Sequence, residues 1–157
     1  MFKDTVDRFR FDLSVAALQK GLELMRTGRY SEAAESFQEA IRLKEDAPHI
    51  WAVKYNLSRA YRRLGRCEEA SLLAKEVVDQ EKDVEESMQV DAAWLMCLCA
   101  EDLGDLDKAR KMLRVIMRRW PTSATIPDAR KRLNEITVRI WKKQETKPAQ
   151  PQPQPQS

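Results

Sequence analysis

The residue types that most often carry catalysis or bind metals are sparse in this chain of 157 residues. There is one histidine, His49, and a lone histidine is more often a structural residue than a ligand or a catalytic base. Cys97 and Cys99 are two positions apart, so a helix places them on different faces, where they cannot share a metal. Four glycines spread along the chain offer no phosphate-binding loop. We therefore predict a protein that is not an enzyme and that holds no metal or cofactor.

The composition predicts a helical, water-exposed protein. Charged residues make up 34% and hydrophobic residues 43% of the chain, which is rich in Ala, Leu, Glu, Lys and Arg. No stretch approaches the roughly 18 apolar residues that a membrane span requires, and the N-terminus lacks the apolar core of a signal peptide. The three cysteines are interpreted as small buried side chains in a reducing compartment, so we expect a cytoplasmic protein.

A helix–turn–helix pattern recurs three times. It is clearest around Asn56–Ala70, where Leu57, Ala60, Tyr61 and Leu64 form a helical stripe that ends at a glycine. The three turn glycines, Gly28, Gly65 and Gly104, are 37 and 39 residues apart. A period of this length is typical of stacked helical hairpins. We expect the hairpins at about 14–46, 48–83 and 84–121, with a final helix at 125–143.

The pattern resembles the tetratricopeptide (TPR) repeat, whose unit is about 34 residues. Small residues and the turn glycine recur in register, while the later aromatic position is met only once and the terminal proline only by Pro121. The resemblance implies an all-α fold: three antiparallel hairpins stacked as a short right-handed solenoid with a C-terminal capping helix. The residues expected to pack the repeats are Gly21, Gly28, Ala33, Phe37, Ala40, Ser58, Tyr61, Gly65, Ala70, Cys97, Gly104 and Ala109.

Two segments flank the predicted repeat domain at 14–143. Residues 1–13 place Phe2, Val6, Phe9 and Leu13 on one stripe of an amphipathic segment. We expect this segment to dock on the first hairpin as a cap, the alternative being an arm that packs in a groove of another molecule. Residues 144–157 are rich in Pro and Gln and predict an extended, disordered tail.

In TPR arrays the first helix of each hairpin lines a concave groove that holds a peptide or a helix. By that resemblance the function is a protein–protein interaction scaffold or adaptor. Leu and Met would form an adaptable floor, Arg would pair with carboxylates, and Tyr and Trp would anchor the partner. An alternative for the first hairpin is that Leu18 and Leu22 are buried against the N-terminal segment. The expected groove residues are Leu18, Leu22, Met25, Tyr55, Arg59, Arg62, Arg63, Trp94, Leu98 and Glu101.

One variant of the family holds the carboxylate end of chaperone tails with Lys, Asn and Arg. Asn56 matches one of these positions, but Leu18 and Leu22 stand where Lys and Asn are expected. The third hairpin is acidic at the corresponding helix rather than basic. We therefore do not expect this chain to bind chaperone tails.

The charge is unevenly distributed, which leaves two further functions open. Residues 1–104 carry 15 basic and 20 acidic side chains, whereas residues 105–157 carry 13 and 5, so the net charges are −5 and +8. The basic end would suit nucleic acid or an anionic membrane surface, although no nucleic-acid recognition module is present. Opposite charges at the two ends would also suit head-to-tail self-association as a structural unit.

Overall fold

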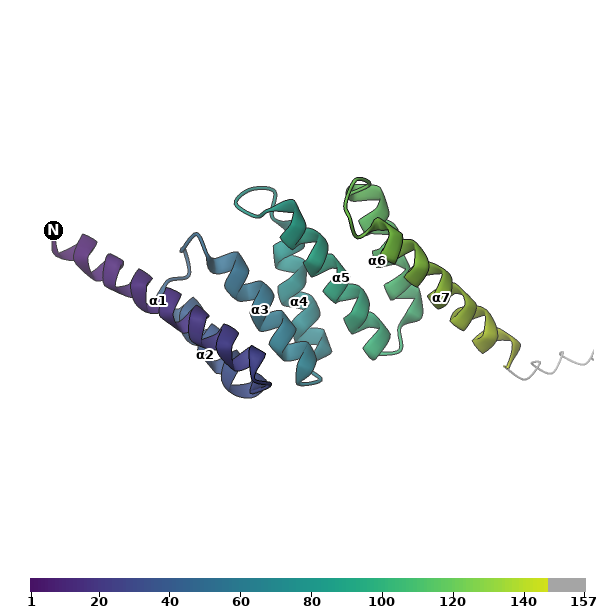
Figure 1. Ribbon diagram of the computed structural model, residues 1–157, viewed down its shortest axis with the longest axis horizontal. Coiled ribbons are helices and arrows are strands. Elements are labelled where there is room, and N and C mark those ends of the chain that lie inside the picture. Colours follow the sequence, from purple (N-terminus) through teal and green to yellow (C-terminus); the bar gives the residue numbers. More distant parts are fainter. Residues whose placement is uncertain (147–157) are drawn as a thin grey trace, which may run out of the picture.

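The computed structural model describes residues 1–146, which form seven helices stacked in an elongated array without a strand (Figure 1). The predicted all-α fold, a solenoid of helical repeats, is therefore confirmed. Its three hairpins are followed by a single helix that packs against the last hairpin. The helices are α1 (Phe2–Arg26), α2 (Tyr30–Leu43), α3 (Ile50–Arg63), α4 (Cys67–Asp79), α5 (Glu86–Asp102), α6 (Leu106–Arg119) and α7 (Ile126–Glu145).

The three hairpin turns share one backbone conformation. Gly28, Gly65 and Gly104 have φ angles of 78°, 75° and 77°, a left-handed region that side chains with a Cβ rarely adopt. At each turn the amide after the glycine donates back to a carbonyl in the last turn of the helix, as from Arg29 to Leu24 at 2.9 Å. This Schellman-type ending satisfies carbonyls that the helix would otherwise leave unpaired, and it reverses the chain within three residues.

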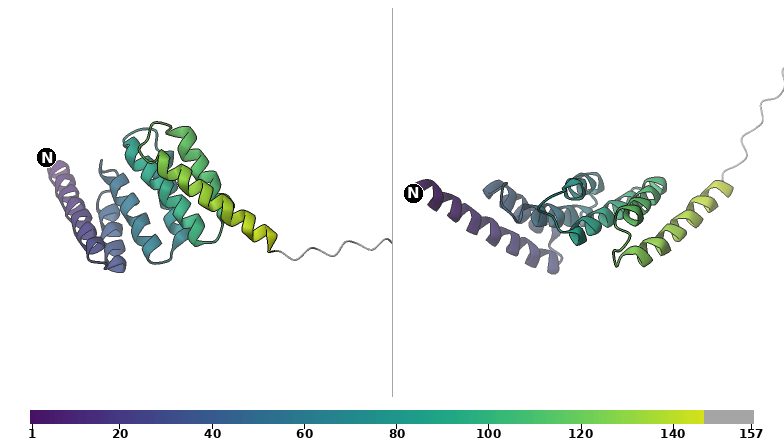
Figure 2. Two further views of the ribbon diagram at one scale, coloured as in Figure 1. Left: turned by 45° about the vertical axis from the view of Figure 1, so that its right-hand side comes forward. Right: turned by 90° about the horizontal axis from the view of Figure 1, so that it is seen from above.

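Small side chains allow the two helices of each hairpin to approach closely. Ala33, Ala70 and Ala109, at the same position of α2, α4 and α6, are completely buried. In the first hairpin a Cβ placed on Gly21 of α1 would lie 2.6 Å from Cδ1 of Phe37 in α2. The glycine is therefore required by the aromatic ring that fills the space beside it. The hairpins lie side by side along the array (Figure 2).

The long repeat period is taken up in two places. Six-residue loops at 44–49 and 80–85 join successive hairpins, and another at 120–125 joins the third hairpin to α7. In addition, α5 has 17 residues whereas α3 has 14, which largely explains why the second spacing exceeds the first. The structure thus uses both of the ways in which a repeat can exceed 34 residues.

The N-terminal segment does not fold back as a separate cap, although Phe11 packs on His49 and Asp7 lies 3.9 Å from Lys44 in the loop that follows the first hairpin. Residues 1–13 continue α1 as one unbroken helix, because no turn-forming residue separates them from the first hairpin. Phe2 and Phe9 are 90% and 63% exposed, so this part of α1 projects from the stack (Figure 1). The alternative burial of Leu18 and Leu22 against this segment is wrong for the same reason. Leu18 instead packs against the main core.

The last helix is held to the third hairpin by a buried carboxylate. Glu101 of α5, only 7% exposed, accepts hydrogen bonds from Arg132 and Arg139 of α7, each at 2.8 Å. Apolar contact is added by Ala129 and Ile136, which are completely buried. Helix α7 ends at Glu145, two residues beyond the expected end, and the rest of the predicted tail (147–157) lies outside the described residues.

Substitution of Gly21 by Ala tests the close approach. Ala normally favours a helix over Gly by about 1 kcal/mol. Here the added methyl meets the buried Phe37 ring, and we expect a net loss of about 1–3 kcal/mol in the free energy of unfolding. Urea unfolding of Gly21→Ala, Phe37→Leu and the double variant measures the coupling between the two sites. Leu at position 37 should relieve part of the destabilisation that Gly21→Ala causes. If the two substitutions change the free energy of unfolding in a strictly additive way, the contact between Gly21 and Phe37 is contradicted.

Candidate functional site

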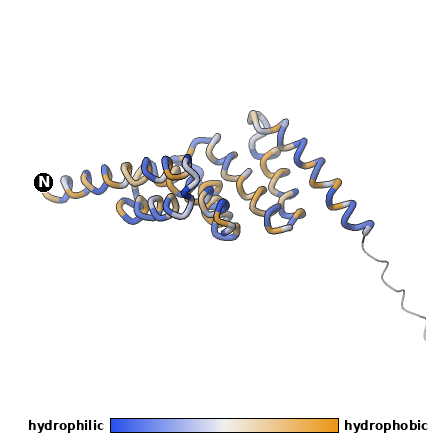
Figure 3. The backbone as a smooth tube through the Cα atoms, turned by 60° about the horizontal axis from the view of Figure 1, so that its bottom comes forward, coloured by the Kyte–Doolittle hydropathy of each residue, from blue (hydrophilic) through white to orange (hydrophobic). Residues whose placement is uncertain are grey.

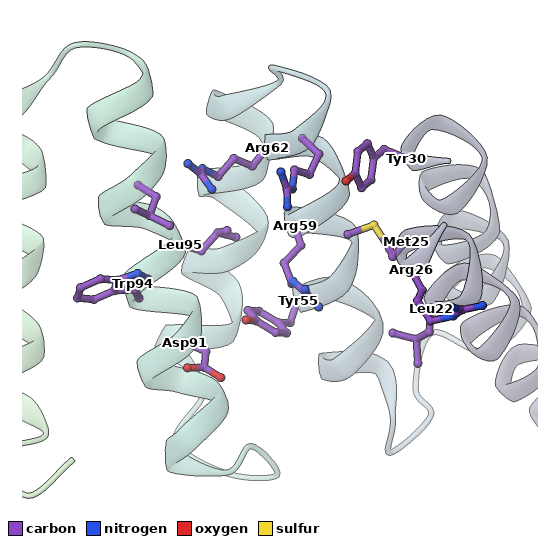
Figure 4. A pocket seen from close by; sticks show the side chains of 12 residues that line it. Leu22, Met25, Arg26, Tyr30, Tyr55, Arg59, Arg62, Asp91, Trp94 and Leu95 are labelled. Atoms are coloured by element: carbon purple, nitrogen blue, oxygen red, sulfur yellow. The ribbon is translucent and has the colours of Figure 1, made fainter. Parts of the chain in front are cut away.

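A groove of about 490 Å³ runs across the first helices of the three hairpins, α1, α3 and α5. Figure 4 shows Tyr55 and Arg59 of α3 in the middle, between Trp94 of α5 on one side and Met25 of α1 on the other. The groove is lined by Leu22, Met25, Arg26, Tyr30, Tyr55, Arg59, Arg62, Arg63, Asp91, Trp94, Leu95 and Leu98.

Helical periodicity explains which residues reach the groove. On α3, Tyr55, Arg59, Arg62 and Arg63 follow at intervals of three and four and so share one face. Equivalent intervals bring residues of α1 and α5 to the same surface. Eight of the ten residues expected in the groove line it: Leu22, Met25, Tyr55, Arg59, Arg62, Arg63, Trp94 and Leu98.

The other two expected residues, Leu18 and Glu101, do not line this groove. Leu18 turns toward the core, as described above. Glu101 lies one turn beyond Leu98 on α5, where α7 covers it and supplies two arginines to its carboxylate. The error arose because sequence periodicity identifies a helix face but not the neighbouring helix that packs on it.

Four further residues line the groove: Arg26, Tyr30, Asp91 and Leu95. Arg26 stands four residues after Leu22 on α1, a spacing that would have identified it. Tyr30 is the first residue of α2, and it reaches the groove because the three-residue turn at Gly28 returns the chain beside the end of α1.

Two of the four groove arginines are already paired with carboxylates. Arg62 donates to Asp102 at 2.8 Å, and Arg26 pairs with Glu23 at 2.6 Å. Arg59 and Arg63, in contrast, have no carboxylate within 4.0 Å among residues 1–146. These two guanidinium groups are therefore the cations of the groove that a ligand carboxylate would meet without displacing an existing ion pair.

Aromatic rings and one amide hold these two free guanidinium groups in place. Arg59 donates from Nη1 to Oδ1 of Asn56 at 3.0 Å and lies 5.8 Å from the ring centre of Tyr55. Arg63 lies 5.4 Å from the ring centre of Tyr30. Cation–π contact and a neutral hydrogen bond orient a guanidinium group without neutralising its charge.

One acidic residue balances the arginines at one end of the groove. Burial raises the pKa of the Asp91 carboxyl, although the nearby charge of Arg59 acts in the opposite direction. Burial also raises the pKa of Tyr55, assisted by the charge of Asp91, so its phenol keeps its proton further into the alkaline range. The groove thus offers cationic, aromatic and apolar surface together with one carboxyl.

Comparison with known proteins identifies the family. Residues 18–81 and 55–124 match the family model of the tetratricopeptide repeat, and together they span most of the chain. The chain belongs to the tetratricopeptide repeat family. No curated protein matches it.

Solved TPR structures have the same fold as this TPR protein. The N-terminal domain of stress-induced protein-1 from C. elegans has a TM-score of 0.69 at 15% identity, over 82% of this chain and 97% of that one. The type III secretion chaperone SycD of Yersinia enterocolitica, in complex with a peptide of the translocator YopD, has a TM-score of 0.66 at 14% identity (85% and 95%). The first TPR of Spaghetti (RPAP3), bound to the HSP90 peptide SRMEEVD, has a TM-score of 0.64 at 17% identity (83% and 94%).

The single histidine of this TPR protein lies in the loop that follows α2 and packs against α1. Ser14, completely buried in α1, donates to the carbonyl of Ala40 and lies 2.8 Å from Nε2 of His49. Burial lowers the pKa of His49, and Phe11 packs edge-on against its ring at 5.2 Å. Within residues 1–146 there is no group of three or more His, Cys, Asp and Glu that could hold a metal ion. No helix of that part of the chain has the length and apolar character needed to cross a membrane.

The buried thiols predict a pH-dependent stability. Burial raises the pKa of Cys97 and of Cys99 to about 12, whereas the pKa of a cysteine thiol in an unfolded chain is about 8.5. Above that pH the folded state binds more protons than the unfolded state, so the free energy of unfolding falls as pH rises toward 12. Urea unfolding across the alkaline range should therefore show a steeper fall for the natural chain than for Cys97→Ala/Cys99→Ala. Equal slopes would contradict the burial of the ionising sulfur atoms.

Proposed function

We propose that this TPR protein is a non-catalytic interaction scaffold that binds a peptide or helical segment of another protein in the groove of α1, α3 and α5. The observation that carries the proposal is the pair of arginines, Arg59 and Arg63, that face the groove without carboxylate partners in the described part of the chain. They stand beside Tyr55 and Trp94, residue types that dominate binding energy at protein interfaces.

The groove suits a segment that carries a carboxylate next to large apolar side chains. A carboxylate of the partner would bridge Arg59 and Arg63, since guanidinium groups bind carboxylates in a planar, two-bonded geometry. The apolar side chains would then rest on Leu22 and Met25 to one side and on Trp94 and Leu98 to the other. Asp91 would accept a hydrogen bond from a backbone amide or a basic side chain of the same segment.

The TPR neighbours support this mode of binding. SycD and the first TPR of Spaghetti are each in complex with a peptide of another protein. For the present chain we propose a ligand other than a chaperone tail. Leu22 occupies the groove where such sites are expected to offer a polar side chain, and Arg62 is engaged by Asp102. The three free thiols support a reducing compartment, and we propose a cytoplasmic location.

Binding of nucleic acid or an anionic membrane through the basic C-terminal helices has less support. Some of the basic side chains of these helices already form ion pairs within the chain. Arg132 and Arg139 neutralise Glu101, and Arg110 pairs with Asp107. Internal ion pairs reduce the number of cations available to release counterions from a polyanion. We therefore place the function in the groove.

A peptide-display selection on the full chain tests the groove, followed by affinity measurement on the selected peptides. We expect peptides with a carboxylate beside an aromatic or aliphatic residue. Their affinity should fall about tenfold or more with Arg59→Gln and with Trp94→Ala, as for central interface residues. Arg114→Gln, at an exposed arginine of α6 outside the groove, is the matched control and should leave the affinity unchanged. Selected peptides that bind all three variants equally would place the site elsewhere.

A further inference from the structure

The N-terminal end of the stack presents an apolar face that nothing covers among residues 1–146. Phe2, Val6, Phe9 and Leu13 of α1 follow at intervals of four, three and four residues, and all four are exposed. Hydrophobic bands recur along this projecting part of α1 in Figure 3. Exposed aromatic side chains in a continuous row are a feature of surfaces that bind other proteins.

The same face continues into a groove between α1 and α2. Further steps of three and four residues lead from Leu13 to Ala16, Lys20 and Leu24, all of which line a groove of about 370 Å³. No residue of α3 lines it, and it shares no residue with the groove proposed to bind peptides. We call the row of exposed apolar residues and this groove together the entry face.

The α2 wall of the entry face is acidic. Glu32, Glu35 and Glu39 lie three and four residues apart and line the groove, opposite a single cation, Lys20. Glu32 pairs with Arg29, the residue before α2, and Glu39 pairs with Arg42 of α2, whereas Glu35 has no ion pair in the described part of the chain. An apolar row beside an acidic wall fits a helix that carries apolar and basic side chains on one side.

Helix α7 at the opposite end of the molecule has such a side (Figure 1). Val138 and Trp141, the latter 58% exposed, face away from the helix surface that packs on the third hairpin. Arg130 and Lys131, about two to three turns before them, are exposed and have no ion pair within residues 1–146. Helix α7 spans about 30 Å, a length that the entry face of α1 matches, since α1 has 25 residues.

We propose that α7 of one copy docks on the entry face of a second copy, so that the chain associates head to tail. Val138 and Trp141 would cover the phenylalanines of α1, while Arg130 and Lys131 would face the glutamates of α2. The alternative pairing of two α1 rows is less favourable. Lys3 and Arg10 flank the row on the same edge, and an antiparallel pair would bring these like charges together. A head-to-tail contact leaves one free entry face and one free α7 on every open assembly, so further copies can add at either end.

Two blocked variants of the full chain test the proposal by sedimentation velocity. Phe9→Glu blocks the entry face and leaves α7 intact, whereas Trp141→Glu blocks α7 and leaves the entry face intact. Both substituted side chains are exposed, so helical content and thermal unfolding should match the natural chain. Leu72→Glu, at an exposed leucine of α4 away from both ends, is the control and should associate like the natural chain.

The natural chain should reach masses above twice 18.3 kDa as its concentration rises, and added salt should reduce them. Each blocked variant alone should sediment as a single chain, and an equimolar mixture of the two should double the mass and stop there. A natural chain that stays monomeric at every concentration, or a mixture that does so, would overturn the proposal. Trp141→Glu that still dimerises alone would also overturn it, because it would show that two α1 rows pair with each other.

Discussion

Two helices can pack backbone against backbone only where neither carries a bulky side chain at the crossing point. In this TPR protein that constraint is met by Gly21 beneath the Phe37 ring and by Ala33, Ala70 and Ala109 at the same place in each hairpin. Close approach keeps each hairpin thin, and the contacts of α2 with α3 and of α4 with α5 then set the spacing of α1, α3 and α5 across the groove. The packing of Gly21 and the three alanines within the hairpins therefore contributes to the positions of the large side chains in the groove.

The hairpins and the groove face were predictable from local patterns. The turn glycines and the small residues recur in register, and intervals of three and four residues assign Tyr55, Arg59 and Trp94 to one surface. The arrangement at both ends of the stack was not predictable in this way. Whether residues 1–13 fold back, and whether Glu101 faces a ligand or α7, depends on contacts between helices that a single helical period does not encode.

The two ion pairs that Arg132 and Arg139 of α7 form with Glu101 also bear on the uneven distribution of charge along the chain. The C-terminal part of the chain carries a net charge of +8, but a portion of this charge neutralises a carboxylate of the third hairpin. A buried carboxylate that lost these partners would remain without compensation at a substantial cost in free energy. Glu101 thus helps to fix the position of α7, while other cations of the C-terminal part, such as Arg114 of α6 and Arg130 of α7, remain exposed.

The contacts between helices run only between close neighbours along the chain: α1 touches α2 and α3, and no contact links the first hairpin with the third within residues 1–146. A globular core resists bending because segments distant in the sequence contact one another, whereas a stack with contacts only between neighbours bends more easily. Small rotations at each of the successive interfaces add up over the length of the array. The curvature of the inner surface can therefore change at a low cost in free energy, and under the proposed function the groove would fit segments of different thickness without breaking any single interface.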